Sequence, residues 1–283
     1  MSFEVAADAY GRFMGRYSAP LAVAFTEVAG IHRGQRAHDV GCGPGALTAE
    51  LVRLLGGEAV CAVDPSKSFV AAARERLPGV DVRESGAERI PFPDGAFDAA
   101  LAQLSVHFMT DPVAGLREMA RVTRPGGTVA ACVWDHAGGR GPVALLWQAA
   151  AELDPSAPDE SGLAGVREGH LASLFAAAGL AGARATELTV RVRHASFEEW
   201  WEPFTQGVGP AGEYVTSLAS EARASAMILS ALPIGMFFVI QFIAPDFYGS
   251  VWNEHLTKVL LLGAGGWMLV GNFIMFKMVN FKI

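Results

Sequence analysis

Cysteine is scarce in this chain, and neither a zinc site nor a disulfide framework can be built from it. The three cysteines are Cys42, Cys61 and Cys132, and none belongs to a C-x-x-C pair or lies near histidines at zinc-ligand spacing. Their odd number and their positions in short apolar runs predict reduced, buried thiols and no metal site. The first residues also lack a basic segment followed by an apolar core, so no secretory signal is expected.

Basic residues are too few to suggest a nucleic-acid partner. The chain of 283 residues has 22 Lys and Arg against 29 Asp and Glu, a formal net charge of −7, and no basic patch or arginine-aromatic run. Such a chain has no electrostatic reason to bind nucleic acid. We therefore expect a small-molecule partner.

What the chain does have is a glycine-rich turn between two apolar runs. The glycines of this turn are Gly41, Gly43 and Gly45. They follow the apolar run 37–40 and precede residues 46–55, which have helical spacing. The next apolar run, 59–63, ends at Asp64, whose carboxylate can accept hydrogen bonds from both hydroxyls of a ribose. This pattern predicts a nucleotide-type cofactor pocket, and a turn followed by an acid fits a dinucleotide as well as S-adenosylmethionine.

Strand and helix patterns alternate through the first two thirds of the chain. Beyond the first two strands, we expect strands at 80–83, 97–103, 128–134 and 183–194. Residues 112–123 have a helical period between two of them. The alternation predicts an α/β fold with a doubly wound, mostly parallel sheet.

The order of these motifs resembles that of class I S-adenosylmethionine-dependent methyltransferases. The G-x-G-x-G turn preceded by Asp39 is similar to the first motif of that family, and the other matching segments are 62–66, 86–94, 97–103 and 121–127. The resemblance implies a Rossmann-like fold, S-adenosylmethionine as cofactor and a small-molecule methyl acceptor. It makes 183–194 strand six. A seventh, antiparallel strand ends the sheet in that family, but here residues 221–223 lead directly into apolar sequence, so strand seven is predicted to be missing.

The resemblance also implies where the cofactor binds. The glycine turn would hold its amino-acid end, Asp64 its ribose, and Ala87 with Glu88 its adenine, although Gly86 stands where relatives often have an acid. Gln103 follows a strand and would meet the methionine moiety. The predicted site residues are Tyr10, Asp39, Gly41, Gly43, Gly45, Asp64, Pro65, Ser66, Ala87, Glu88 and Gln103.

No universal catalytic residue is needed, because methyl transfer is an in-line displacement that depends mainly on alignment and on the exclusion of water. His107 and His136 both follow predicted strand ends, where ligand-facing loops of parallel sheets lie. Histidine can remove a proton near neutral pH. Both are candidates for a general base, and the alternative of ordinary loop or core histidines stays open.

The last part of the chain is nearly free of charge. The charged residues of 226–283 are Asp246, Glu254, Lys258, Lys277 and Lys282. Its two apolar runs, 226–244 and 259–276, have 19 and 18 residues, each near the length that spans a bilayer core. Two lysines near the end favour a cytoplasmic C-terminus. We therefore expect a two-helix transmembrane hairpin through residues 226–276, in the inner (plasma) membrane, with the catalytic domain cytoplasmic.

This tail has a resemblance of its own. Residues 220–283 are similar to the C-terminal end of the F-domain inner-membrane proteins of tight-adherence, type II secretion-like systems, which implies secretion-system partners. Two domains are expected, a methyltransferase domain at 1–222 and a membrane hairpin at 223–283. The alternatives are a membrane secretion component with a non-catalytic Rossmann-like domain and a NAD(P)-dependent oxidoreductase.

Overall fold

The chain divides into two compact units, Met1–Gly212 and Glu213–Ile283. A computed structural model describes residues 7–157, 159–244 and 254–279. The predicted domain boundary after residue 222 falls inside a continuous helix, α8 (Gly209–Ile243).

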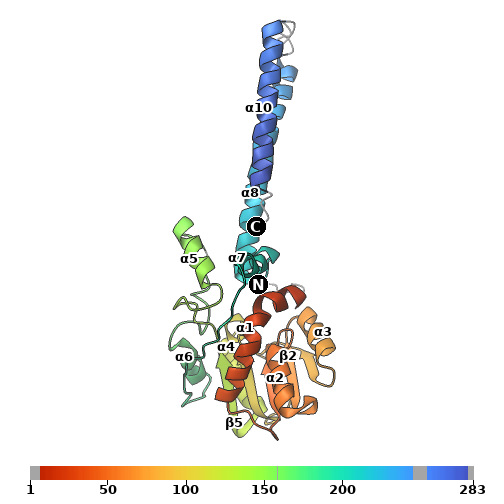
Figure 1. Ribbon diagram of the computed structural model, residues 1–283. Coiled ribbons are helices and arrows are strands. Elements are labelled where there is room, and N and C mark those ends of the chain that lie inside the picture. The colour runs from red at the N-terminus through yellow and green to blue at the C-terminus, as the bar shows by residue number, and fades with distance from the viewer. Residues whose placement is uncertain (1–6, 158, 245–253, 280–283) are drawn as a thin grey trace. The chain divides into compact units, whose positions relative to one another are not determined.

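The first unit is built on a five-stranded parallel sheet with the order β3-β2-β1-β4-β5 (Figure 1). Its strands are β1 (Ala37–Val40), β2 (Val60–Asp64), β3 (Asp81–Glu84), β4 (Phe97–Gln103) and β5 (Thr123–Cys132). The central strand β1 pairs with β2 on one side and with β4 on the other, and each of its residues is buried. The strand order reverses between β1 and β4, and in such sheets ligands bind at the carboxyl ends of the strands near this point. The predicted doubly wound parallel sheet is confirmed.

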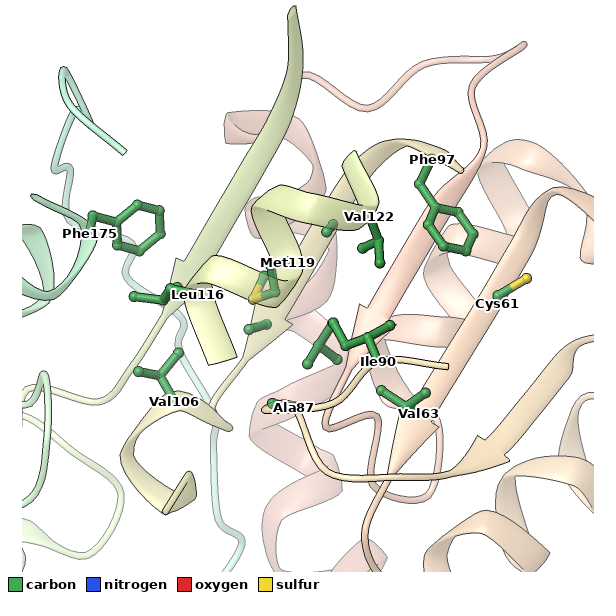
Figure 2. Packing of buried hydrophobic residues seen from close by; sticks show 13 residues of the cluster. Cys61, Val63, Ala87, Ile90, Phe97, Val106, Leu116, Met119, Val122 and Phe175 are labelled. Carbon is green, nitrogen blue, oxygen red and sulfur yellow. The ribbon is translucent and has the colours of Figure 1, made fainter. Parts of the chain in front are cut away.

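Helices cover both faces of the sheet, as the buried clusters show. On one face, Leu116, Met119 and Val122 of α4 (Pro112–Val122) pack against residues that include Phe97 and Val63, as Figure 2 shows. On the other face, α1 (Ala7–Val28) and α2 (Ala46–Leu55) bury apolar side chains against β1 and β4. The central strands β1 and β2 are buried at every residue because neither face of the sheet meets water there.

The remaining helices of the first unit lie around this sheet. The α-helices are α3 (Lys67–Arg76), α5 (Ala144–Leu153), α6 (His170–Ala177) and α7 (Phe197–Trp201). Three short 3₁₀ helices are η1 (Gly57–Ala59), η2 (Val106–Phe108) and η3 (Glu202–Gln206).

The sixth strand predicted at 183–194 is wrong, because no residue of that segment pairs in the sheet. The alternation did identify which side chains turn inward, since Leu188, Val190 and Val192 are half-buried between exposed neighbours. Strand formation also needs a partner edge, and side-chain alternation does not supply one. Among the described residues the sheet contains no antiparallel strand, so strand seven is missing there as well.

The second unit consists, in its described residues, of most of α8 and of α10 (His255–Val279). The α8 helix has 35 residues and contains an 18-residue stretch of mean hydropathy 2.2, none of it buried, so it is long and apolar enough to cross a membrane. The α10 helix carries a shorter apolar stretch, Lys258–Ile274. The predicted link between two spans falls largely at 245–253, outside the described residues, and the hairpin therefore stays a prediction.

The candidate cofactor site and an adjoining cavity

A cavity of about 320 Å³ lies at the carboxyl ends of β1, β2 and β4. Small-molecule sites commonly measure about 300–1,000 Å³. All of the predicted cofactor-site residues line this cavity except Gly45. Lining residues that the sequence did not point to include Ser18, Phe69, Leu104, Ser105, Phe108 and Thr110. The structure thus brings residues of α1 and of the segments 39–47, 64–69, 86–88 and 103–110 to one place.

The three glycines of the turn have different tasks. Gly41 has a φ of +74°, and a Cβ there would collide with Ser105. Gly43 also has a positive φ, +54°, and the nearest atom to a Cβ there would be Tyr10 Cε1 at 4.0 Å, so the turn leaves open space on its cavity side. Gly45 precedes α2, and a Cβ there would lie 3.0 Å from Leu77 Cδ1. This third glycine serves packing near the end of α3 rather than the cavity.

Asp64 ties the glycine turn to the end of β2. Its Oδ2 accepts from the Gly43 N–H and its Oδ1 from the Ser66 N–H, both at 2.8 Å, and the residue is only 5% exposed. Burial raises its pKa, while these two hydrogen bonds lower it. A carboxylate oxygen has two lone pairs, so each can accept another hydrogen bond from a ligand. Burial and the charge of Asp64 raise the pKa of Tyr10 to about 12, which keeps this neighbouring hydroxyl protonated.

Two buried acceptor atoms at the cavity have no hydrogen-bond partner among the described residues, Asp39 Oδ1 and Gln103 Oε1. The other Asp39 oxygen accepts from Thr48 Oγ1 at 2.6 Å, and Gln103 Nε2 donates to the Ser18 carbonyl at 3.0 Å. Burial raises the pKa of Asp39 to about 7, with the nearby charge of Asp64 adding to the effect. Unsatisfied buried acceptors are costly, and a ligand with several N–H donors and a positive charge would satisfy both.

The remaining predicted residues have structural contacts as well. Glu88 Oε1 accepts from the N–H groups of Thr110 and Asp111, at 2.8 and 3.1 Å. Ser66 caps α3 by accepting from the Phe69 N–H at 3.4 Å. The Phe69 ring in turn lies 5.1 Å from that of Tyr10.

The α1 helix forms one wall of the cavity and is held at several points. Tyr10 and Ser18 of α1 line the cavity, and Ser18 is bound by Gln103. On the other side, Arg16 Nη1 lies 3.1 Å from Glu199 Oε1. The Phe13 ring contacts that of Phe204 at 5.0 Å between centroids.

A second cavity, of about 50 Å³, shares Tyr10, Leu104 and Phe108 with the first. It brings together the two candidate bases, because His107 and His136 both line it, with ring centroids 6.0 Å apart. Leu104, between the cavities, has a φ of +59°. Such a backbone is strained for a bulky residue, and strain of this kind clusters at functional sites.

Other sequence expectations concern metals and thiols. Cys42, Cys61 and Cys132 are free thiols, of which the first two are buried. In the part of the chain that the structure describes, no group of three or more His, Cys, Asp or Glu side chains could hold a metal ion.

The comparisons with known proteins agree with this site. Residues 38–131 match the family model described as a methyltransferase domain. The ubiquinone/menaquinone biosynthesis C-methyltransferase UbiE of Proteus mirabilis is 38% identical over 109 residues, which are 36% of this chain and 43% of that protein. The demethylmenaquinone methyltransferase of Beutenbergia cavernae is 39% identical over 98 residues, 35% of this chain and 40% of that protein. A solved SAM-dependent methyltransferase from Aquifex aeolicus is 28% identical, covers 42% of this chain and 67% of that one, and has a TM-score of 0.39.

These matches indicate the class of the first unit, whose residues 38–131 are similar to a methyltransferase domain. The chain spans less than half the length of the two curated relatives.

Proposed function

We propose that this protein transfers the methyl group of S-adenosylmethionine to a small-molecule acceptor. The observation that carries the proposal is the pair of unpartnered buried acceptors, Asp39 Oδ1 and Gln103 Oε1, in the same cavity as Asp64. The ammonium group of the methionine moiety would donate to Asp39 Oδ1 and Gln103 Oε1, and the ribose hydroxyls would donate to Asp64. When bound, S-adenosylmethionine supplies a methyl group on a positively charged sulfur, and this bond breaks with its electron pair staying on sulfur.

The residues of the chain then bind and orient rather than react. Gly43 allows the backbone to approach the ligand, and Tyr10 and Ser18 of α1 form part of the cavity wall. Alignment and exclusion of water supply much of the rate enhancement in a displacement of this kind.

A quinone-like acceptor is favoured by the relatives. Two of them, in Proteus mirabilis and Beutenbergia cavernae, are named for methylation in ubiquinone or menaquinone biosynthesis. We therefore propose an apolar ring compound as the acceptor class.

We further propose that the C-terminal unit anchors the enzyme to the inner membrane as a two-helix hairpin. The length and hydropathy of α8 support one span. The second span would be α10, whose last turn contains Lys277, and the methyltransferase domain would then be cytoplasmic. Partners from a secretion system rest on the resemblance of residues 220–283 alone.

Isothermal titration of the full chain in detergent, with S-adenosylhomocysteine and NAD in parallel, tests the proposed function. Binding of the first and not of the second is expected, together with transfer of a tritiated methyl group to a lipid extract. Binding of NAD alone would favour the oxidoreductase. Binding without any transfer would favour a non-catalytic domain of a secretion component.

A further inference from the structure

The second cavity is placed where an acceptor has to enter. It adjoins the cofactor cavity at Tyr10, Leu104 and Phe108. Much of the rest of its wall is apolar and includes Phe13 and Val143. A cavity of about 10–15 Å³ is enough for one water molecule, so a cavity of about 50 Å³ takes the reacting end of a molecule rather than the whole of it.

Two buried polar atoms from residues that line this cavity have no hydrogen-bond partner in the part of the chain that the structure describes, Trp134 Nε1 and His107 Nδ1. An indole N–H can only donate, and a neutral imidazole that carries its proton on Nδ1 donates from that nitrogen as well. Buried polar groups without partners are rare and costly, so each calls for an explanation. A hydroxyl oxygen has two lone pairs, so a single hydroxyl can accept from both atoms and keep its own proton free to donate.

The two histidines differ in their electrostatic surroundings. Burial and the neighbouring His136 lower the pKa of His107 to about 3, so His107 stays neutral at physiological pH. Burial also lowers the pKa of His136, but the carboxylates of Glu160, Asp135 and Asp159 act in the opposite direction. His136 is thus the histidine whose protonated form has counter-charges.

Among these three carboxylates, Glu160 belongs to the cavity itself. It lines the cavity, is 6% exposed, and accepts from Trp147 Nε1 at 2.9 Å. Asp135, by contrast, is paired with Arg140 at 2.7 Å. Glu160 is therefore the buried charge that faces the site without an arginine partner of its own among the described residues.

We propose that the second cavity binds the methyl acceptor by a hydroxyl group on an otherwise apolar molecule, and that His136 takes the hydroxyl proton while Glu160 stabilises the resulting imidazolium. This inference rests on the proposed methyl transfer. Trp134 Nε1 and His107 Nδ1 donate to the hydroxyl oxygen, which leaves the hydroxyl proton for His136. In the proton transfer the O–H bond breaks with its electron pair left on oxygen, an N–H bond forms on His136, and the imidazolium later returns its proton to water. His136 is then a catalytic residue and Glu160 a positioning residue.

The test uses 4-nitrophenol as a probe, since its phenolate absorbs in the visible and its phenol does not. The full chain in detergent, saturated with S-adenosylhomocysteine, is titrated with 4-nitrophenol and with 4-nitrotoluene, which lacks the hydroxyl. We expect 4-nitrophenol to bind at least about tenfold more tightly, the value of one or two hydrogen bonds. Trp134→Phe should remove most of this difference in affinity. Measuring wild type and variant at the same detergent concentration cancels the effect of probe partitioning into micelles.

The proton transfer has its own spectroscopic readout. Bound 4-nitrophenol should show phenolate absorbance in the wild type, lose it in His136→Gln, and show less of it in Glu160→Gln, which keeps an acceptor for Trp147. His32→Gln, at an exposed histidine that lines neither cavity, is the matched control. Unchanged affinity for S-adenosylhomocysteine in each variant shows that the variant is folded.

The possible outcomes distinguish a failure of this inference from a failure of the proposed methyl transfer. Equal affinity for the two probes would refute the hydroxyl site, and phenolate absorbance that persists in His136→Gln would refute the base. A wild-type chain that fails to bind S-adenosylhomocysteine would instead refute the proposed function on which this inference rests.

Discussion

Replacing Asp39 with asparagine should stabilise the free protein and weaken cofactor binding at the same time. Burial raises the pKa of Asp39 from 3.8 to about 7, a shift of about 3 pKa units, so keeping it ionised above pH 7 costs roughly 4 kcal/mol. Asparagine keeps an oxygen for the Thr48 hydroxyl. Its NH₂ group replaces an oxygen that has no partner, at a cost of about 1–3 kcal/mol. We expect a net gain of roughly 1–3 kcal/mol at pH 8.

The stability gained by Asp39→Asn should decrease as the pH falls. Because the native pKa of Asp39 lies above its unfolded value, the native state holds a proton between pH 3.8 and about 7 that the unfolded state has lost. The stability that this proton provides is present at low pH and is lost as the pH rises through about 7. The advantage of Asp39→Asn should therefore shrink by roughly 3 kcal/mol between pH 8 and pH 5.

Binding should change in the opposite sense. Loss of a charged acceptor for the ammonium group costs about 1.5–3 kcal/mol, or roughly a tenfold to hundredfold weaker affinity for S-adenosylhomocysteine. Thermal unfolding by near-UV circular dichroism at pH 5 and 8, with calorimetric titration of the ligand, measures both effects. Asp154→Asn, a surface change of equal charge outside both cavities, is the control. An Asp39→Asn variant that is less stable at pH 8, or that binds the ligand as the wild type does, would refute the reasoning.

Three further predictions concern other residues. Asp64→Ala should weaken S-adenosylhomocysteine binding more than any other single change, because it removes acceptors for two hydroxyls, and unchanged affinity in calorimetry would contradict this role. His38→Phe should stabilise the first unit increasingly as the pH falls from 6.5 towards 4, because burial lowers the native pKa of His38 to about 4. In this range the unfolded wild type binds a proton that the native state does not, which costs the wild type about 1.4 kcal/mol of stability per pH unit. Thermal unfolding across this range measures the stability difference between variant and wild type, and a difference independent of pH would argue against a neutral buried His38. Reporter fusions after residue 283 and within 249–254 should report opposite sides of the membrane, and the same side for both would exclude the hairpin.

Most of the sheet could be predicted from the sequence because its central strands are marked by patterns within short stretches of the chain. Apolar runs that end at Val40 and Asp64, with glycines between them, specify buried parallel strands and the crevice beside them. Residues 183–194 show the limit of such reasoning, since alternation identified the inward side chains but the edge of β5 took no partner there. Pairing depends on a second segment, and the pattern of one segment does not contain it.

Some residues of the candidate site could be placed from the sequence and others could not. The placement of Asp39 and Gln103 at one cavity follows from their positions at parallel strands. Gly45 was misplaced because a glycine that admits a ligand and a glycine that admits a neighbouring side chain look the same in sequence. Glu160 was missed because it reaches the second cavity from a segment between α5 and α6 that has no periodic pattern.

The position of α1 has a consequence for the order of events during turnover. Tyr10 belongs to the walls of both cavities, and Ser18, on the same helix, is fastened to Gln103. A displacement of α1 large enough to admit a nucleoside would therefore also open the wall of the second cavity, where the acceptor is proposed to bind. We expect an ordered cycle in which the nucleoside enters first and leaves last, with its exchange slower than that of the acceptor.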